Sequence, residues 1–263
     1  MHPNTFIEQL WRGVEADRVF VAMSFAPQYD ARFRDVFRPA IETVRYRGRQ
    51  LTASRVDESQ TGDSIVTEIV RGICESRLVL ADVSDLTGES GAVEPVRNGN
   101  VMYELGLAHA VKSPGKVLIV RDDSNRLLFD LSSIPHFIVD FTAVESARAR
   151  VTGLLNDRLR EFETIDDMKL RTFIDSISDT ELSVLVLLFN SGETDPVDLT
   201  ITSGSNKVLP LAHRDAIHNL RDAGLVRSHI AQNPVVVLYS LTERGQRAFH
   251  TLARVLKDAK SKT

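Results

Sequence analysis

Glu104 is the chemically unusual residue of the segment NGNVMYELGLAHA, residues 98–110, which otherwise carries an apolar helical stripe. An ionised carboxylate that is held in place can attack the anomeric carbon of a sugar and form a covalent intermediate. Enzymes that break glycosidic bonds generally give two carboxyl groups separate roles. The spacing equally allows an ordinary interpretation, in which Asn100 caps the helix and Glu104 only favours its start. In both interpretations we expect the helix dipole to keep the Glu104 carboxylate ionised.

Other polar residues follow the apolar segments that we predict to be strands. In an open parallel sheet, ligands bind beyond the carboxyl ends of the strands, near the switch in strand order. We therefore predict that Asp82 works with Glu104, by binding sugar hydroxyls or by assisting proton transfer to the leaving group. The predicted substrate-binding residues are Ser24, Phe25, Asp57, Gly62, Ser84, Asn98 and Asn100. The alternative for these residues is a local role, in turns at strand ends or at the start of a helix.

Strand and helix patterns alternate through the first half of the chain. The patterns predict strands at Arg18–Phe25, Leu51–Asp57, Arg77–Val83, Lys116–Arg121 and His136–Phe141, and helices at Asp30–Arg45, Gly62–Ser76, from Asn98 onward, and at about Ala143–Phe162. Pro39 should bend or interrupt the first helix. Nearly all-apolar strands that alternate with helices imply right-handed crossovers and a parallel sheet covered on both faces. We predict an α/β domain over residues 1–163, with a five-stranded doubly wound sheet in the flavodoxin-like order 2-1-3-4-5.

From Thr164 the pattern changes to that of a small α+β domain, residues 164–263. We predict helices at Thr180–Asn190, at Leu211–Ala223 with Gly224 as a stop, and from Glu243 to about Lys257, and a hairpin formed by Leu225–Ile230 and Val235–Leu241. The segments AIHNLRDAGLVRSH and LYSLTERGQRAF resemble the recognition helix, wing and final helix of winged helix-turn-helix domains. Basic and acidic residues are equally numerous in this domain, which disfavours DNA and favours dimerisation or contact with a partner.

Composition limits the class of protein. The 263 residues are 43% hydrophobic and 26% charged, which is typical of a globular protein with a sizeable core. No apolar run approaches the roughly 18–20 residues that cross a bilayer, and the first residues lack the apolar region of a signal peptide. The single cysteine excludes an intramolecular disulfide, so we expect a cytoplasmic protein without membrane attachment. A net charge of −4 argues against general affinity for nucleic acid.

No cofactor and no metal ion is predicted. The seven histidines and the lone Cys74 do not have the spacing of metal ligands. No GxGxxG segment follows the first strand, and the chain has no Walker loop, which disfavours dinucleotide reduction and NTP hydrolysis.

Four segments within Arg18–Phe141 resemble, in order, a bacterial group related to nucleoside 2-deoxyribosyltransferases and TIR-like domains. They are VFVAMSFAPQYDARFRDVFRPAIE, RVDESQTGDSIVTEIVRGICESRLVLADVS, NGNVMYELGLAHAVKSPGKVLIV and LLFDLSSIPHFIVDF. The resemblance implies that Glu104 is the nucleophile and that Asp82 matches the strand-end aspartate of the family. In deoxyribosyltransferases an acid six residues before the glutamate helps to hold the substrate, whereas this chain has the amide Asn98 and lacks that possible proton carrier. TIR domains that cleave NAD also use a glutamate, so the resemblance implies NAD as a second substrate.

Three functions remain open from the sequence. The first is an enzyme that cleaves the N-glycosidic bond of a nucleoside, a nucleotide or NAD, by hydrolysis or transfer, for example as an effector of bacterial defence. The second is a regulator whose first domain senses a nucleotide and whose second domain binds DNA or a partner. The third is a TIR-like scaffold that assembles through surface contacts without chemistry. We expect the enzyme, and we expect the chain to form a homo-oligomer.

Overall fold

The computed structural model describes residues 15–56, 65–86, 96–125, 127, 132–191, 196–203, 206–232 and 235–260 of the chain. The chain divides into two compact units, Met1–Glu163 and Thr164–Thr263. The first unit contains a parallel sheet of five strands, and the described strands of the second unit pair only in an antiparallel manner.

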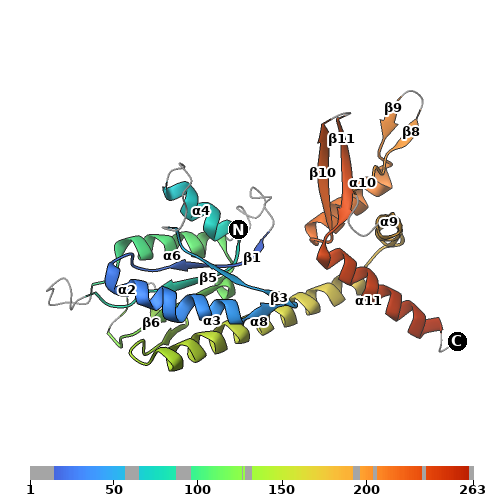
Figure 1. The fold of residues 1–263 in the computed structure, drawn as a ribbon. Coiled ribbons are helices and arrows are strands. Elements are labelled where there is room, and N and C mark those ends of the chain that lie inside the picture. Colours follow the sequence, from blue (N-terminus) through green and yellow to red (C-terminus); the bar gives the residue numbers. More distant parts are fainter. Residues whose placement is uncertain are drawn as a thin grey trace. The chain divides into compact units, whose positions relative to one another are not determined.

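The sheet of the first unit has the strand order β4-β1-β5-β6-β7, with every pair parallel (Figure 1). Its strands are β1 (Ala16–Ala22), β4 (Thr52–Ser54), β5 (Ser76–Asp82), β6 (Val117–Arg121) and β7 (His136–Ile138). When these five strands are numbered one to five along the chain, their order in the sheet is 2-1-3-4-5. This confirms the predicted α/β sheet in its flavodoxin-like order. The order reverses between β1 and β5, so the residues just beyond these two strands lie where such sheets bind ligands.

Helices cover both faces of this sheet, with α3 and α8 on one face and α4 and α6 on the other (Figure 1). The helical segments of the first unit are α2 (Pro27–Ala31), η1 (Arg32–Phe37), α3 (Arg38–Thr43), α4 (Ile65–Glu75), α6 (Gly99–Val111), η3 (Pro114–Lys116) and α8 (Val144–Asp175). The apolar stripe of the first helical segment is buried throughout, at Phe33, Val36, Phe37, Ala40, Ile41 and Val44. On α4, Ile69 and Ile73 are buried, whereas Ile65, which begins the helix, is 68% exposed.

Pro39 explains the irregular start of the first helical segment. In a regular α-helix its ring would clash with the carbonyl group of Asp35, four residues earlier. The chain instead forms the π-helical segment η1 and then α3, with Pro39 in the first turn of α3. The carbonyl oxygen of Asp35 accepts hydrogen bonds from Arg148 of α8, at 3.2 Å from Nε and 3.0 Å from Nη2. The predicted interruption is therefore present, and an arginine of a distant helix satisfies the carbonyl group.

A short hairpin follows α3 where the prediction extends the helix to Arg45. Its strands, β2 (Arg45–Tyr46) and β3 (Arg49–Gln50), pair in an antiparallel manner. Between them Arg47 and Gly48 have φ angles of 52° and 82°, and two consecutive positive values are what a type I′ hairpin turn requires. Arginine is uncommon at such a position, so the sequence did not predict this turn.

Gly72 on α4 packs directly against the buried ring of Phe20 on β1. A Cβ atom at position 72 would lie 2.7 Å from two carbon atoms of that ring. We expect Gly72→Ala to lower the free energy of unfolding by about 1–3 kcal/mol, the usual cost of overpacking a core. The matched control is Gly153→Ala on α8, where nothing lies within 4 Å of the added atom and the change should be neutral or stabilising. Thermal unfolding of both variants measures the difference, and equal stability would contradict this packing.

The helix α8 is longer than predicted. The sequence predicted a helix that ends near Phe162, whereas α8 continues to Asp175 and therefore crosses the boundary between the two units. Residues 154–175 contain no glycine and no proline, so nothing in the sequence ends the helix earlier. Beyond the boundary, Leu170 and Ile174 of α8 belong to the core of the second unit.

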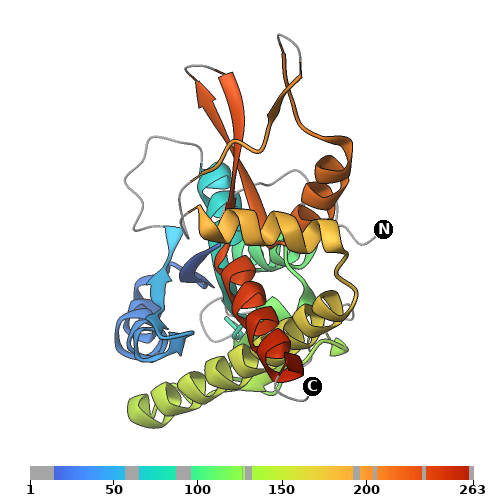
Figure 2. The same ribbon diagram turned by 90° about the vertical axis from the view of Figure 1, so that its right-hand side faces the viewer.

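Over the residues that the structure describes, the second unit contains three further helices and two hairpins. Its elements are α9 (Asp179–Asn190), β8 (Ile201–Ser203), β9 (Asn206–Val208), α10 (Leu211–Asp222), β10 (Val226–Gln232), β11 (Val235–Leu241) and α11 (Glu243–Lys260). The strands β10 and β11 run side by side in both views (Figures 1 and 2), which confirms the predicted hairpin. The pair β8 and β9 was not predicted.

Gly224 ends α10 as predicted. Its φ angle is 69°, a left-handed conformation that favours glycine. The N–H group of Gly224 donates to the carbonyl of Arg221, and that of Leu225 donates to the carbonyl of Leu220, each at 2.8 Å. These two bonds form a Schellman motif, which satisfies carbonyl groups at the end of the helix.

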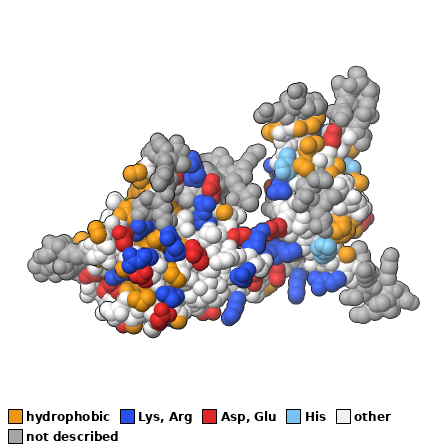
Figure 3. Space-filling view, viewed as in Figure 1, with side chains coloured by type: hydrophobic (Ala, Val, Ile, Leu, Met, Phe, Trp, Pro, Cys, Tyr) orange, Lys and Arg blue, Asp and Glu red, His pale blue; other side chains and the backbone are white. Residues whose placement is uncertain are grey.

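Charged side chains of both signs are interspersed over the face of the first unit that Figure 3 shows. Among the described residues, none of the helices combines the length and the apolar character that a bilayer crossing demands.

Candidate functional site

The start of α6 is tied to the end of β1 by Asn98. The side-chain oxygen of Asn98 accepts hydrogen bonds from the backbone N–H groups of Asn100 at 3.0 Å and Val101 at 3.3 Å. Its side-chain nitrogen donates to Ser24 Oγ at 3.2 Å. The helix cap is therefore Asn98, and the alternative in which Asn100 caps α6 is wrong. Two predicted binding residues, Ser24 and Asn98, do come together at the switch in strand order.

Glu104 lies on the buried face of α6. Val101, Leu105 and Ala108 follow the helical spacing of the same stripe and pack in the apolar core between α6 and the sheet. Glu104 itself is 3% exposed. The part of the chain that the structure describes contains no hydrogen-bond or ion-pair partner for its carboxyl group. Burying a carboxyl group without a partner in such an apolar stripe costs free energy of folding, so packing alone does not explain why it is there.

Burial raises the pKa of Glu104 to about 7. The expectation that the helix start keeps this group ionised is therefore wrong, for a geometric reason. Because Asn98 caps the helix, Glu104 lies beyond the first turn, where the effect of the dipole fades. Near neutral pH the carboxyl group consequently exists in both forms, and a small change of environment moves it from one to the other.

Asp82, at the end of β5, is held by two neighbours. One of its oxygens accepts hydrogen bonds from the backbone N–H and the hydroxyl of Ser84. The other accepts from Arg32 Nη1 at 3.1 Å. Burial raises the pKa of Asp82, while Arg32 and Ser84 donate hydrogen bonds that stabilise its ionised form. The predicted pair Asp82 and Ser84 is thus brought together, with an arginine that the sequence analysis missed.

Arg32 joins the ends of β5 and β6. Its Nη2 forms an ion pair with Asp122, and its Nη1 also donates to Ser84 Oγ at 2.9 Å. The guanidinium carbon lies 4.6 Å from the ring centroid of Tyr29 and 4.4 Å from that of Phe141, so two aromatic rings fix its position. Helical spacing offered a signal, because Arg32 precedes the buried Val36 by four residues and so shares its side of the helix.

A second arginine, Arg97, organises the neighbouring loop. Its guanidinium donates to both oxygens of Asp123, at 2.6 and 2.8 Å, and to the carbonyl of Val83 at 2.6 Å. Burial alone would raise the pKa of Asp123, but the bonds from Arg97 and from backbone N–H groups lower it. Asp85 accepts a bond from the N–H of Val96 and one from the side chain of Asn125. Nothing in the sequence pattern distinguished these contacts from ordinary loop residues.

The other predicted site residues are exposed or lie outside the described residues. Phe25 is 42% exposed, and the guanidinium of Arg55 lies 5.4 Å from its ring centroid. Asn100 is exposed in the first turn of α6. Asp57 and Gly62 lie outside the described residues.

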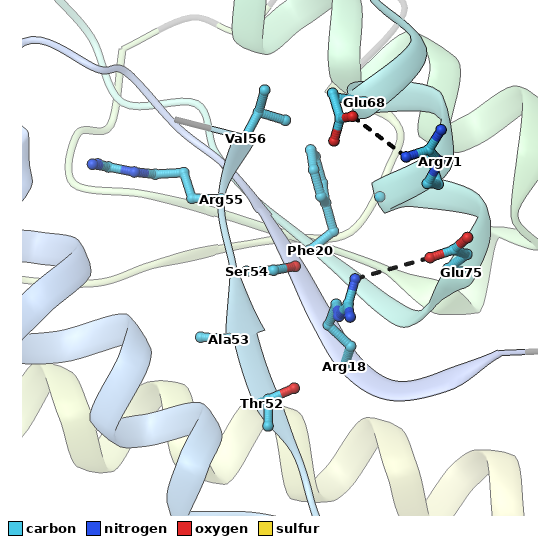
Figure 4. Close-up of a pocket in the computed structure, with 11 residues that line it drawn as sticks. Arg18, Phe20, Thr52, Ala53, Ser54, Arg55, Val56, Glu68, Arg71 and Glu75 are labelled. Atoms are coloured by element: carbon cyan, nitrogen blue, oxygen red, sulfur yellow. Dashed lines mark hydrogen bonds and ion pairs between the residues drawn. The ribbon is translucent and has the colours of Figure 1, made fainter. Parts of the chain in front are cut away.

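A cavity of about 340 Å³ lies beside β4, on the face of the sheet that α4 covers (Figure 4). Its lining residues are Arg18, Phe20, Thr52, Ala53, Ser54, Arg55, Val56, Glu68, Arg71, Gly72 and Glu75. Arg18 lies 4.0 Å from Glu75, and Arg71 lies 3.4 Å from Glu68. None of the described residues predicted for the site lines this cavity, so its volume gives no support to them.

Comparison with models of known protein families and with curated proteins finds no match to this chain. Among the described residues, histidine, cysteine, aspartate and glutamate side chains form no group of three that could hold a metal ion.

Proposed function

We propose that the first unit cleaves the N-glycosidic bond of a nucleoside, a nucleotide or NAD through the carboxylate of Glu104. The observation that carries the proposal is a buried carboxyl group that has no partner among the described residues and whose pKa is raised to about 7. Such groups are costly for stability and cluster at functional sites. The position supports the same conclusion, because α6 begins beside the end of β1, at the switch in strand order.

In the proposed reaction the ionised Glu104 attacks the anomeric carbon, and the base leaves. Attack on the resulting glycosyl ester by water gives hydrolysis, and attack by a second base gives transfer. Burial leaves the ionised carboxylate poorly solvated, which makes it a better nucleophile than an exposed one. Only the ionised fraction of Glu104 can react in this way.

The neighbouring residues have supporting roles in this proposal. Ser24 and Asn98 hold the end of β1 and the start of α6 together and present polar groups toward a sugar. Asp82 and Ser84 are fixed by Arg32, so they offer positioned oxygen atoms. In this proposal Asp82 binds sugar hydroxyls or assists proton transfer to the leaving base.

A second candidate function is a regulator that senses a nucleotide, with a winged helix-like second unit. The order α9, α10, β10, β11 and α11, with the hairpin between the last two helices, supports this resemblance. DNA binding is not favoured, because Asn219 of α10 donates its side-chain amide to Glu181 at 2.9 Å and is already occupied. We therefore propose a partner or a second copy of the chain as the ligand of this unit.

Release of free base tests the proposal. The purified full chain is incubated with NAD and with a panel of nucleosides and nucleotides, and chromatography measures the base. Time-dependent release supports the proposed function. Saturable nucleotide binding without release would favour the regulator, and the absence of both would favour a scaffold without chemistry.

A further inference from the structure

Another cavity lies within the second unit, between the last turns of α8 and the helix α11 (Figure 1). Its volume is about 290 Å³, near the lower end of the roughly 300–1,000 Å³ that is usual for small-ligand pockets. Its lining residues, all of which the structure describes, are Asp167, Leu170, Arg171, Arg247, His250, Thr251 and Arg254. We call it the arginine cavity, because three of these residues are arginines.

Helical spacing brings the lining side chains together. On α11 they follow Arg247 at three, four and seven positions, and on α8 they follow Asp167 at three and four positions. Such spacings place side chains on one face of a helix. The core of the unit lies directly beside them, since it contains Leu170, Ile174, Ala248 and Leu252. The arginines therefore border the apolar contact between the two helices.

Carboxylates of α8 hold α11 in place through one of these arginines. Arg247 donates to Asp166 at 2.9 Å and lies 3.6 Å from Asp167. Asp166 also lies 3.2 Å from the Nε atom of Arg244. These ion pairs join the two helices, so Arg247 already has a structural role.

The two other arginines of the cavity have no such role. In the part of the chain that the structure describes, the side chains of Arg171 and Arg254 form no ion pair and no hydrogen bond. The cavity thus has three guanidiniums and one carboxyl group in its lining, in a chain whose net charge is −4. Like charges that share a hollow repel each other, and a surface that only keeps a protein soluble intersperses both signs. This arrangement favours an anion as the occupant of the cavity.

The number of guanidiniums indicates the kind of anion. A carboxylate carries one charge, and its two oxygens are satisfied by a single arginine. A phosphate monoester carries close to two negative charges at neutral pH and has three oxygens that accept hydrogen bonds, so it can pair with two guanidiniums at once. His250 offers one more N–H donor, and its ring packs edge-on against Phe189 with 5.4 Å between the centroids.

The distribution of charge disfavours a nucleic-acid backbone. Proteins that bind such a backbone spread their cations along a stripe or a helix face. Here the cations converge on one cavity, Asp167 is part of its lining, and Asp166 is bonded to Arg247. An extended polyanion would pass these carboxylates, whereas a small ligand would not.

We propose that the arginine cavity binds the phosphate group of a small phosphorylated molecule, held by Arg171 and Arg254. The inference is independent of the proposed reaction, because every lining residue belongs to the second unit and Glu104 belongs to the first.

Isothermal titration calorimetry with the full chain tests the inference at about pH 7.5, where a phosphate monoester is a dianion. The probes are inorganic pyrophosphate and glycerol 3-phosphate at constant ionic strength, with glycerol as the matched probe without phosphate. We expect dissociation constants below about 1 mM for both anions, because two or three charge-assisted hydrogen bonds provide this affinity, and no binding of glycerol. The double variant Arg171→Gln with Arg254→Gln should bind both anions at least about tenfold more weakly.

A control variant removes two positive charges elsewhere in the same unit. Lys169 and Arg221 are exposed and do not line the cavity, so Lys169→Gln with Arg221→Gln should keep the wild-type affinity. Thermal unfolding gives a second readout, in which pyrophosphate raises the Tm of the wild type and the control but not that of the cavity variant. Without pyrophosphate the cavity variant should unfold at or above the wild-type Tm, because two charges that repel each other are gone.

Four results would overturn the inference. The first is no binding of either anion up to about 10 mM. The second is an equal loss of affinity in the control variant, which would show general charge attraction. The third is binding of pyrophosphate but not glycerol 3-phosphate, because the site would then take a free inorganic anion. The fourth is a short DNA duplex that binds through Arg171 and Arg254 and that neither anion displaces, which would make the cavity a nucleic-acid contact.

Discussion

Replacement of Glu104 by glutamine is expected to lower the rate of base release by on the order of 10³-fold or more. Glutamine has nearly the same size and shape, so it preserves packing in the stripe of α6, but its amide oxygen is a far weaker nucleophile. The measurement is the rate of base release at saturating substrate, followed by chromatography. The matched control is Glu42→Gln, an exposed glutamate on α3, which should retain the wild-type rate.

The same substitution is expected to stabilise the first unit at alkaline pH. The pKa of Glu104 is raised from 4.5 to about 7 in the folded chain. Below about pH 4.5 the group is protonated in both states and costs nothing. As the pH rises from 4.5 to 7 the unfolded chain loses this proton first, so stability falls, by about 3 kcal/mol in full above pH 7. Glu104→Gln should recover most of this loss at pH 8 and little at pH 5.

Denaturant unfolding of wild type and Glu104→Gln at pH 5 and pH 8 measures this effect. A variant that loses activity and gains stability at pH 8 identifies Glu104 as a functional group that the fold tolerates at a cost. A variant that is less stable than the wild type at both pH values would show that Glu104 is structural, contrary to the proposal.

Replacement of Arg32 by methionine is expected to lower the free energy of unfolding by about 3–5 kcal/mol at pH 8. Methionine keeps much of the apolar volume between Tyr29 and Phe141, but it leaves the buried Asp82 without its cation. The loss should be smaller at pH 5, because the raised pKa of Asp82 lets that carboxyl group take up a proton in the folded state. Denaturant unfolding at both pH values measures the two losses.

Two further variants make this prediction specific. Arg34→Met changes an exposed arginine on the same helical segment, where the ion pair with Asp35 contributes little, so it should leave the free energy of unfolding almost unchanged. The double variant Arg32→Met with Asp82→Asn removes the unpaired charge and should be more stable than Arg32→Met alone. Additive losses in the double variant would show that Arg32 and Asp82 do not act as a pair.

The parallel sheet could be predicted because its strands are covered on both faces. Continuous apolar runs such as Leu78–Ala81 and Val117–Val120 can be buried in few other ways, and the helices between them impose parallel crossovers. The apolar stripe from Phe33 to Val44 could likewise be identified from the sequence, because the helical spacing of apolar residues indicates the buried face.

The predictions that were wrong concern details of the backbone that the spacing of apolar residues does not determine. The turn at Arg47 and Gly48 uses an arginine with positive φ, and α8 continues past Phe162 because nothing stops it. Residue type and spacing singled out Glu104, but whether it is ionised depends on which asparagine caps α6 and on how deeply the helix packs. The partnership of Arg32 with Asp82 joins residues fifty positions apart, which only the folded chain reveals.

The most direct test of the account is the dependence of kcat/KM for base release on pH, because this ratio reports ionisation of the free protein. If Glu104 attacks as a carboxylate, kcat/KM should rise with pH, with a midpoint near the pKa of about 7, and then stay level. A ratio that falls as the pH rises through 7 would contradict the account, because it would mean that the protonated form of Glu104 does the chemistry.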